Sequence, residues 1–224
     1  MLQLSALSYR LNGKLFFEDL SVTFEQGYIH TLSGKNGAGK STLLRILHGD
    51  ALAEKGTITV HNKSLVLTKA TDRAQLKKEI GFVPQAASAV IVPELTVAEN
   101  LRLAAITKVK LLSTLPFFER SLIEQFSIPL DAQASSLSGG QKHILAIAMV
   151  LQQQRSVLLL DEPVAALDDE NAALVLACVE TICKKTGIIV IIVTHDPLPI
   201  TAPVQEWSLI VNKNNVRNIV PKDL

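Results

Sequence analysis

Ten consecutive residues determine how the rest of this chain is interpreted: Ser33-Gly34-Lys35-Asn36-Gly37-Ala38-Gly39-Lys40-Ser41-Thr42. This stretch, called the phosphate loop below, has a glycine, four free positions and then Gly-Lys-Ser, a spacing typical of loops that wrap phosphate groups. Glycines suit such a loop because they allow positive φ values and let backbone N–H groups approach an anion closely. The Lys40 ammonium can lie against β- and γ-phosphates, and the Ser41 hydroxyl can coordinate Mg²⁺. The stretch therefore predicts a nucleotide-binding site.

The residues on either side of the phosphate loop fit this prediction. Residues 28–32 alternate and favour a strand, whereas residues 43–47 have the apolar density of a buried helix that ends near Gly49. A helix that begins directly after the loop adds its N-terminal dipole, which also attracts anions. The alternative is a chance glycine-rich turn, which would need neither a strand before it nor a helix after it.

A second cluster ends a run of apolar residues: Val157-Leu158-Leu159-Leu160-Asp161-Glu162-Pro163. An apolar run without alternation is typical of a strand that is buried on both faces of a parallel sheet, and ligands bind at the carboxyl ends of such strands. Asp161 can hold Mg²⁺ through its water shell, and Glu162 can polarise an attacking water as a general base. Taken alone, the acid pair could also be a helix cap or a surface feature.

A third cluster, Ser136-Leu137-Ser138-Gly139-Gly140-Gln141, leads into a helix-like stretch at residues 142–152. Ser138 is a good N-cap residue, and the two glycines leave amide groups bare at a helix N-terminus. The pattern indicates a second anion-binding nest, although a flexible loop that only caps a helix would look the same. One active site does not obviously need two phosphate nests.

The composition limits the classes of partner. The 224 residues carry a net charge of +1, from 22 basic and 21 acidic side chains, and only 4% of them are aromatic. Neither a strong positive field nor a base-stacking surface is present, so we expect no nucleic-acid partner. The hydrophobic content of 48% is high and leaves room for a surface that contacts another protein.

The sequence also bears on membranes and on redox chemistry. Apolar runs such as residues 188–193 are strand-sized, too short to cross a bilayer. Met1-Leu2-Gln3 opens directly into folded sequence, so we expect no signal peptide. Cys178 and Cys183 lack the spacing of a redox or zinc pair, and we expect them to be reduced, packed thiols in the cytosol.

Taken together, the motifs resemble the nucleotide-binding subunit of ABC transporters in order and spacing across essentially the whole chain. The pentapeptide at residues 137–141, called the signature segment below, is very specific to that family and is unaltered here. The residues that carry the resemblance are residues 34–42, Gln85, Leu137-Ser138-Gly139-Gly140-Gln141, Asp161-Glu162-Pro163, Ala166-Leu167-Asp168 and Thr194-His195-Asp196.

The resemblance implies a fold and its division. The fold would be α/β, with a P-loop NTPase core built on a mixed, mainly parallel sheet, an N-terminal antiparallel β subdomain and an inserted α-helical subdomain. Residues 1–224 would form a single nucleotide-binding domain, in which 1–85 and 137–224 are the ATPase core and 86–136 the helical subdomain. From the pattern of residues, 101–126 is expected to be mostly helical with a break near Pro116.

The resemblance also implies roles for individual residues. Two copies would pair head-to-tail, so that the signature segment of each binds the γ-phosphate held by the other. The catalytic residues would be Glu162, His195, Gln85 and Lys40, where His195 holds the attacking water and Gln85 also hinges the helical lobe. ATP would be bound by Gly34, Lys35, Asn36, Gly37, Ala38, Gly39, Lys40, Ser41, Thr42, Ser138, Gly139, Gly140, Gln141 and Asp168. Mg²⁺ would be held by Ser41, Gln85 and Asp161.

Three departures from the family pattern stand out. Leu11 occupies the place of the aromatic ring that usually stacks on adenine, with Tyr9 two residues earlier. Ile144 and Met149 replace two arginines that often follow the signature segment, and Ala165 replaces a common serine. None of these changes removes a group that performs phosphoryl transfer, so we still expect an ATPase. Within the family, the chain resembles a branch of amino-acid importers.

The expected partners follow from the resemblance. They are an integral membrane permease, a second ATP-binding subunit that forms a homodimer in the ATP state, and an extracytoplasmic solute-binding protein. The chain would lie in the cytoplasm, peripheral on the inner face of the cell membrane. The alternative is a soluble ABC-type ATPase switch outside transport. A P-loop kinase or GTPase would not explain the signature segment. The stretch Asn212-Lys213-Asn214-Asn215 also lacks the acidic residue that pairs with guanine in GTP-binding proteins.

Overall fold

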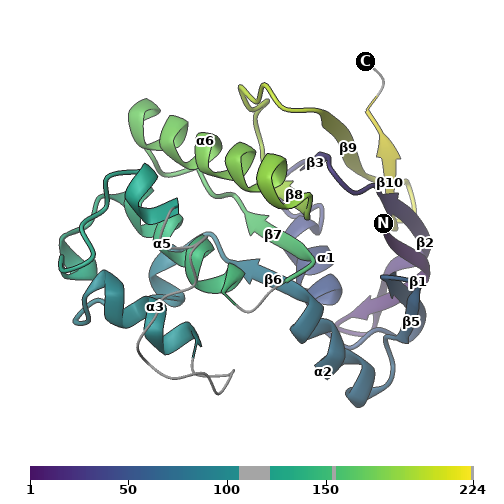
Figure 1. Ribbon diagram of the computed structural model, residues 1–224. Coiled ribbons are helices and arrows are strands. Elements are labelled where there is room, and N and C mark those ends of the chain that lie inside the picture. Colours follow the sequence, from purple (N-terminus) through teal and green to yellow (C-terminus); the bar gives the residue numbers. More distant parts are fainter. Residues whose placement is uncertain (106–121, 153–154, 223–224) are drawn as a thin grey trace.

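The computed structural model describes residues 1–105, 122–152 and 155–222, which form a ten-stranded sheet with helices on both faces (Figure 1). The order across the sheet is β5-β4-β1-β2-β10-β9-β3-β8-β7-β6. The strands are β1 (Leu2–Leu11), β2 (Lys14–Phe24), β3 (Ile29–Ser33), β4 (Lys55–Val60), β5 (Lys63–Val66), β6 (Ile80–Val83), β7 (Val157–Asp161), β8 (Ile189–Val193), β9 (Val204–Val211) and β10 (Arg217–Pro221). The α-helices whose bounds are known are α1 (Lys40–His48), α2 (Ala70–Glu79), α3 (Val97–Ala105), α5 (Gly139–Leu151) and α6 (Asp169–Thr186).

Five strands, β9, β3, β8, β7 and β6, run parallel to one another. Every residue of β7 and β8 is buried, because helices cover both faces of this part of the sheet. Leu159 packs in one core with α1, whereas its neighbours Leu158 and Leu160 pack in the other core with α5 and α6. The apolar runs at residues 157–160 and 189–193 therefore form strands, as predicted. Their side chains pack against helices on both faces of the sheet.

The N-terminal end of the sheet is antiparallel. β1 pairs with β2 through a tight turn at Asn12 and Gly13, whose φ values of 51° and 77° are those that a two-residue hairpin turn requires. β4 and β5 extend this end of the sheet on the other side of β1. The expected α/β class, with a mainly parallel part and an antiparallel part, is confirmed.

Three elements lay outside the expectations from the sequence. The sequence patterns do not predict α2, β5 or β10, and β10 pairs with β9 in an antiparallel ladder. Only Leu76 is buried in α2, only Leu65 in β5 and only Ile219 in β10. A single buried side chain gives no hydrophobic periodicity, so these elements leave little signal in the sequence.

A buried amide ties the start of α3 to the loop that precedes it. Asn100 of α3 is fully buried, its Oδ1 accepts from Val92 N–H at 2.7 Å, and its Nδ2 donates to the carbonyl of Val92 at 2.9 Å. It also donates to the carbonyl oxygens of Leu95 and Thr96. These bonds fix the loop before α3 to the helix. Much of the stretch expected to be helical around Pro116 lies in residues 106–121, outside the described residues.

Cys178 and Cys183 are both free and buried on α6, as predicted. Burial raises the pKa of both thiols, which keeps them protonated. Within the described parts of the chain, no helix combines the length and apolar character that a membrane span requires.

A buried histidine joins β3 to β9. His30 is fully buried, its Nε2–H donates to the carbonyl of Glu25 at 2.9 Å, and its Nδ1 accepts from Trp207 Nε1–H at 3.2 Å. These two partners require a neutral ring, since a proton on Nδ1 would face the indole N–H. Burial lowers the pKa of His30 and outweighs the opposite effect of the bond to Glu25.

We expect His30 to make the fold sensitive to acid. In the unfolded chain this histidine takes up a proton near pH 6.5, about its ordinary pKa, whereas the folded chain keeps it neutral to lower pH. The unfolded state then binds more protons, so the free energy of unfolding falls as the pH drops below that value, by up to about 1.4 kcal/mol per pH unit. Urea unfolding of the wild type and of His30→Gln between pH 8 and pH 5 measures this. The stability difference between the two should shrink toward low pH, and a constant difference would contradict the prediction.

Candidate active site

The phosphate loop connects β3 to α1 at the carboxyl edge of the parallel strands, where open α/β sheets bind ligands. Gly34 has a φ of 154°, and a Cβ at this position would lie 2.8 Å from the carbonyl oxygen of Leu209 in β9. Gly39 has a φ of 106°, and its Cβ would lie 2.5 Å from the ring of Phe16. Both positions therefore require glycine for their backbone and for their neighbours.

Lys40 is the first residue of α1, and its side chain curls back over the loop. Its Nζ donates to the carbonyl oxygens of Gly34 at 2.8 Å and Lys35 at 3.4 Å, and to Nδ1 of His195 at 3.4 Å. The residue is only 5% exposed. Burial lowers the pKa of the ammonium, while the nearby carboxylates of Glu162 and Asp161 oppose that effect. The loop thus places a desolvated cation where phosphate charge would be recognised.

The end of β7 brings the acid pair to the phosphate loop. Ser41 Oγ donates to Asp161 Oδ1 at 3.2 Å. Burial raises the pKa of Asp161, and the hydrogen bond from Ser41 works against it. A hydroxyl and a carboxylate side by side are the oxygen donors that Mg²⁺ prefers, so these two residues fit the ion. Among the described residues, no group of three or more His, Cys, Asp or Glu side chains is placed to hold a metal ion.

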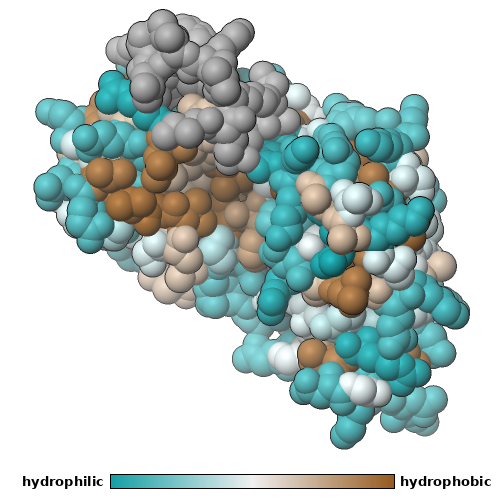
Figure 2. Space-filling view, turned by 90° about the horizontal axis from the view of Figure 1, so that it is seen from below, coloured by the Kyte–Doolittle hydropathy of each residue, from teal (hydrophilic) through white to brown (hydrophobic). Residues whose placement is uncertain are grey.

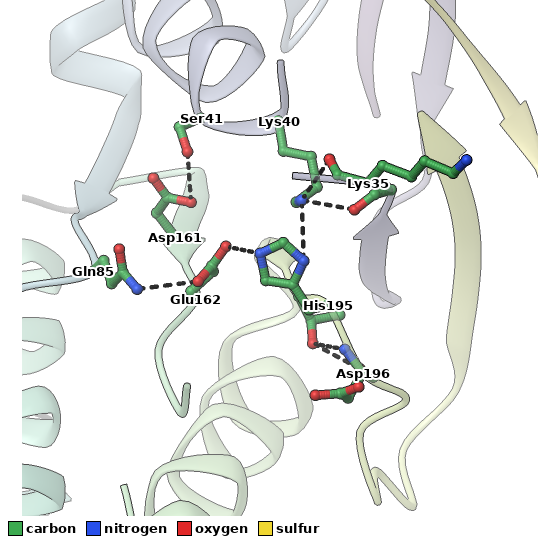
Figure 3. A network of polar contacts seen from close by, with 10 residues as sticks. Lys35, Lys40, Ser41, Gln85, Asp161, Glu162, His195 and Asp196 are labelled. Atoms are coloured by element: carbon green, nitrogen blue, oxygen red, sulfur yellow. Dashed lines mark hydrogen bonds and ion pairs between the residues drawn. The ribbon is translucent and has the colours of Figure 1, made fainter. Parts of the chain in front are cut away.

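Glu162 lies at the centre of the polar network in Figure 3. Its Oε1 is 2.5 Å from His195 Nε2, and its Oε2 accepts from Gln85 Nε2 at 3.0 Å. Lys40 can only donate, so His195 Nδ1 must accept and its Nε2–H must donate to Glu162. Glu162 has a φ of 49°, a left-handed conformation that is uncommon for a residue with a side chain and often found at functional sites.

Two hollows adjoin this network. One, of about 580 Å³, is lined by Leu11, Phe16, Asn36, Gly37, Gly39, Lys40, Ser41, Thr42, Glu162 and His195. The other, of about 600 Å³, has Gly34, Lys35, His195 and Asp196 among its lining residues. Leu11, at 39% exposure, opens into the first hollow, whereas Tyr9 packs against the rings of Phe16 and Phe17. The side chain of residue 11 that lines this hollow is therefore aliphatic and not aromatic.

The signature segment forms a helix start of its own. Ser138 caps α5, since its Oγ accepts from Gln141 N–H at 3.2 Å and Gln141 Oε1 accepts from Ser138 N–H at 3.1 Å. Asp168 caps α6 in the same way by accepting from Asn171 N–H at 2.8 Å. Hydrogen bonds from Asn171 lower the pKa of Asp168. No hydrogen bond among the described residues joins the signature segment to the phosphate loop.

Two residues that the sequence did not single out as functional connect these parts. His143 Nδ1 lies 3.1 Å from the carbonyl oxygen of Gly139, and its Nε2 lies 3.3 Å from the carbonyl oxygen of Gln85. Asn171 contacts Ser138 and Gly140 through its side-chain amide. The only signal for either in the sequence is the place of Asn171 three residues after Asp168, which is typical of a helix start.

The edge of the parallel sheet carries the phosphate loop with its buried lysine, and a serine that lies beside an aspartate. A glutamate that is bound by a histidine and a glutamine lies next to them. This combination defines a P-loop nucleoside triphosphatase fold. The family model described as ABC transporter matches residues 17–165. The chain belongs to the ABC transporter family, which confirms the resemblance drawn from its motifs.

Comparison with known proteins adds individual relatives. The chain is 33% identical over 199 residues to the arabinose import ATP-binding protein AraG of Rhizobium etli. The match covers 87% of this chain and 39% of that protein. It is 35% identical over 185 residues to the glutamine transport ATP-binding protein GlnQ of Bacillus subtilis, covering 80% of this chain and 74% of that protein. The chain thus spans about two fifths of the length of the arabinose relative.

Among solved structures, cbiO1 from Clostridium perfringens, described as part of the ABC transporter complex cbiONQ, is similar with a TM-score of 0.82 and 25% identity. The structural match covers 98% of this chain and 86% of the cbiO1 chain. The ATP-binding cassette MJ0796 bound to ADP and Pi has a TM-score of 0.74 at 21% identity and supports the fold. The names of the relatives refer to sugars and to amino acids, so they do not single out the amino-acid importer branch.

Proposed function

We propose that this chain binds and hydrolyses ATP and that hydrolysis energises the transport of a solute through a separate membrane permease. The observation that carries the proposal is the continuous contact from Lys40 through His195 to Glu162 and on to Gln85. It joins the residue that binds phosphate to the residue that activates water. Family membership and the import and transport relatives support the coupling to transport.

In the proposed mechanism the chain orients the reactants and stabilises charge. The phosphate loop and Lys40 hold the β- and γ-phosphates, and Ser41 with Asp161 would hold Mg²⁺, which neutralises charge on the phosphate oxygens when bound. Glu162 accepts a proton from the attacking water while His195 keeps it in place. The water oxygen bonds to the γ-phosphorus, the bond to the β,γ-bridging oxygen breaks, and the electrons of that bond stay with ADP.

The proposed active unit contains two copies arranged head-to-tail. Ser138, Gly139, Gly140 and Gln141 of one copy would bind the γ-phosphate held by Lys40 of the other. In support, the signature segment has the backbone N–H groups and dipole of a capped helix start. A γ-phosphate would then satisfy donors of both copies at once, and its release would let the copies separate.

The permease would contact the helical subdomain at residues 86–136. Gln85 is exposed and directly precedes this subdomain in the chain. The backbone carbonyl of Gln85 contacts His143 of α5. Figure 2 shows apolar surface gathered on the part of the molecule beside the grey residues, and Leu103 of α3 is 45% exposed. Apolar surface of this kind is typical of a protein interface. A movement of Gln85 with the nucleotide would be transmitted to the partner through this subdomain.

The test is affinity purification of a tagged Glu162→Gln chain from native membranes with ATP, followed by identification of the copurifying proteins. A permease with several membrane spans, present with ATP and reduced with Lys40→Ala, supports the transport function. An eluate that contains soluble proteins alone refutes it and favours a soluble ATPase switch, while the chemistry of the site would still stand.

A further inference from the structure

One side chain of α6 accepts hydrogen bonds from two of the donors at the start of α5. Asn171 Oδ1 accepts from Ser138 Oγ at 2.7 Å and from Gly140 N–H at 3.3 Å. The hydroxyl has one proton and the backbone amide has one, so each serves a single acceptor in good geometry. A phosphate oxygen that binds to Ser138 and Gly140 therefore competes with the amide oxygen of Asn171.

The orientation of the Asn171 amide is fixed by its other end. Nδ2 donates to Oδ1 and Oδ2 of Asp168 at 3.0 and 2.9 Å. If the amide were turned over, its NH₂ group would face the Gly140 N–H, which can only donate, and its oxygen would face a carboxylate. The oxygen thus points to the signature segment, and the NH₂ group points to Asp168.

The fit between Asn171 and the signature segment is close. A Cβ at Gly140 would lie 2.7 Å from Asn171 Oδ1 and 2.9 Å from its Cβ and from its carbonyl oxygen. Glycine at this position is therefore needed for the contact with α6 as well as for an anion. The amide dipole of Asn171, with its oxygen toward the helix start, is also favoured by the positive end of α5.

We propose that Asn171 is an internal competitor of the γ-phosphate that must leave the signature segment when the ATP-bound dimer closes. The inference rests on the proposed function, in which Ser138 and Gly140 of one copy bind ATP held by the other. A displaced amide would also lose its two bonds to Asp168, whose carboxylate would then keep only the cap bond from Asn171 N–H. Asn171 would thus link phosphate binding at α5 to the position of Asp168 at α6.

The experiment measures the ATP concentration that gives half-maximal dimerisation, by analytical ultracentrifugation, in a Glu162→Gln background. Asn171→Ala removes the competitor but keeps the backbone N–H that caps α6 through Asp168. A hydrogen bond of this kind is worth about a 3- to 10-fold change in an equilibrium, so the required ATP should fall by that factor. Asn171→Asp, which places a charged acceptor on the same donors, should raise it more than about tenfold.

Glu170→Gln is the matched control, because Glu170 is exposed in the first turn of α6 and should leave the required ATP unchanged. In the chain with Glu162 intact, Asn171→Ala should lower the KM for ATP more than it changes kcat, which a purely structural role would not do. If Asn171→Ala needs the same ATP or more, the inference is wrong while the composite site stands. If the Glu162→Gln parent itself stays monomeric at saturating ATP, the composite site is wrong and the inference falls with it.

Discussion

Replacing Glu162 with glutamine should lower kcat for ATP hydrolysis by about 10²- to 10⁴-fold, the usual contribution of a general base. Glutamine cannot take a proton from water. It also has one acceptor oxygen, whereas His195 and Gln85 both donate to the carboxylate of Glu162. The phosphate loop is untouched, so ATP should still bind, and the variant should accumulate as an ATP-bound dimer.

Phosphate release and gel filtration with ATP measure these two effects of Glu162→Gln. Glu170→Gln makes the same chemical change at an exposed position at the start of α6 and should keep the wild-type rate. Turnover of Glu162→Gln within a fewfold of the wild type would show that Glu162 is not the group that activates water.

Replacing Lys40 with alanine should weaken ATP binding by roughly 10- to 100-fold and abolish hydrolysis. A hydrogen bond to a charged group contributes about 1.5–3 kcal/mol, and Lys40 is the buried cation of the phosphate loop. The substitution also removes the donor that holds His195 through Nδ1, so the orientation of His195 toward Glu162 is lost as well. Both binding and chemistry should therefore fail together.

Titration with a fluorescent ATP analogue, alongside phosphate release, measures the effect of Lys40→Ala. Lys63→Ala is the control, since Lys63 is an exposed lysine of β5. An unchanged affinity in Lys40→Ala would mean that residues 33–42 do not form the nucleotide site.

The central strands could be predicted because burial on both faces leaves an unbroken apolar run, as in residues 157–160. α2 and β10 could not, because each buries a single side chain, which leaves no hydrophobic periodicity. The acid pair and the phosphate loop were visible as local motifs. Their contact, however, depends on which strands become neighbours.

His195 shows how the site depends on pairing. Leu32 of β3 pairs in register with Val193 of β8, so the residues that follow both strands emerge at the same edge of the sheet. That register brings Lys40 and His195 together across 155 positions of sequence. From the sequence, His195 gained a role only from the family resemblance. Asn171 had no such signal, because its partners in α5 are about thirty residues earlier and are met only through the packing of α5 on α6.

The strand β9 has a consequence for the order in which the protein is made. All the motifs of the nucleotide site have been translated by residue 196, yet the carbonyl of Leu209 that lies behind Gly34 has not. β9 pairs directly with β3, and His30 takes its bond from Trp207. On the ribosome, a growing chain thus carries every motif before the phosphate loop has its supporting strand. We expect nucleotide binding to begin only once the segment that contains β9 has been synthesised and has folded against β3.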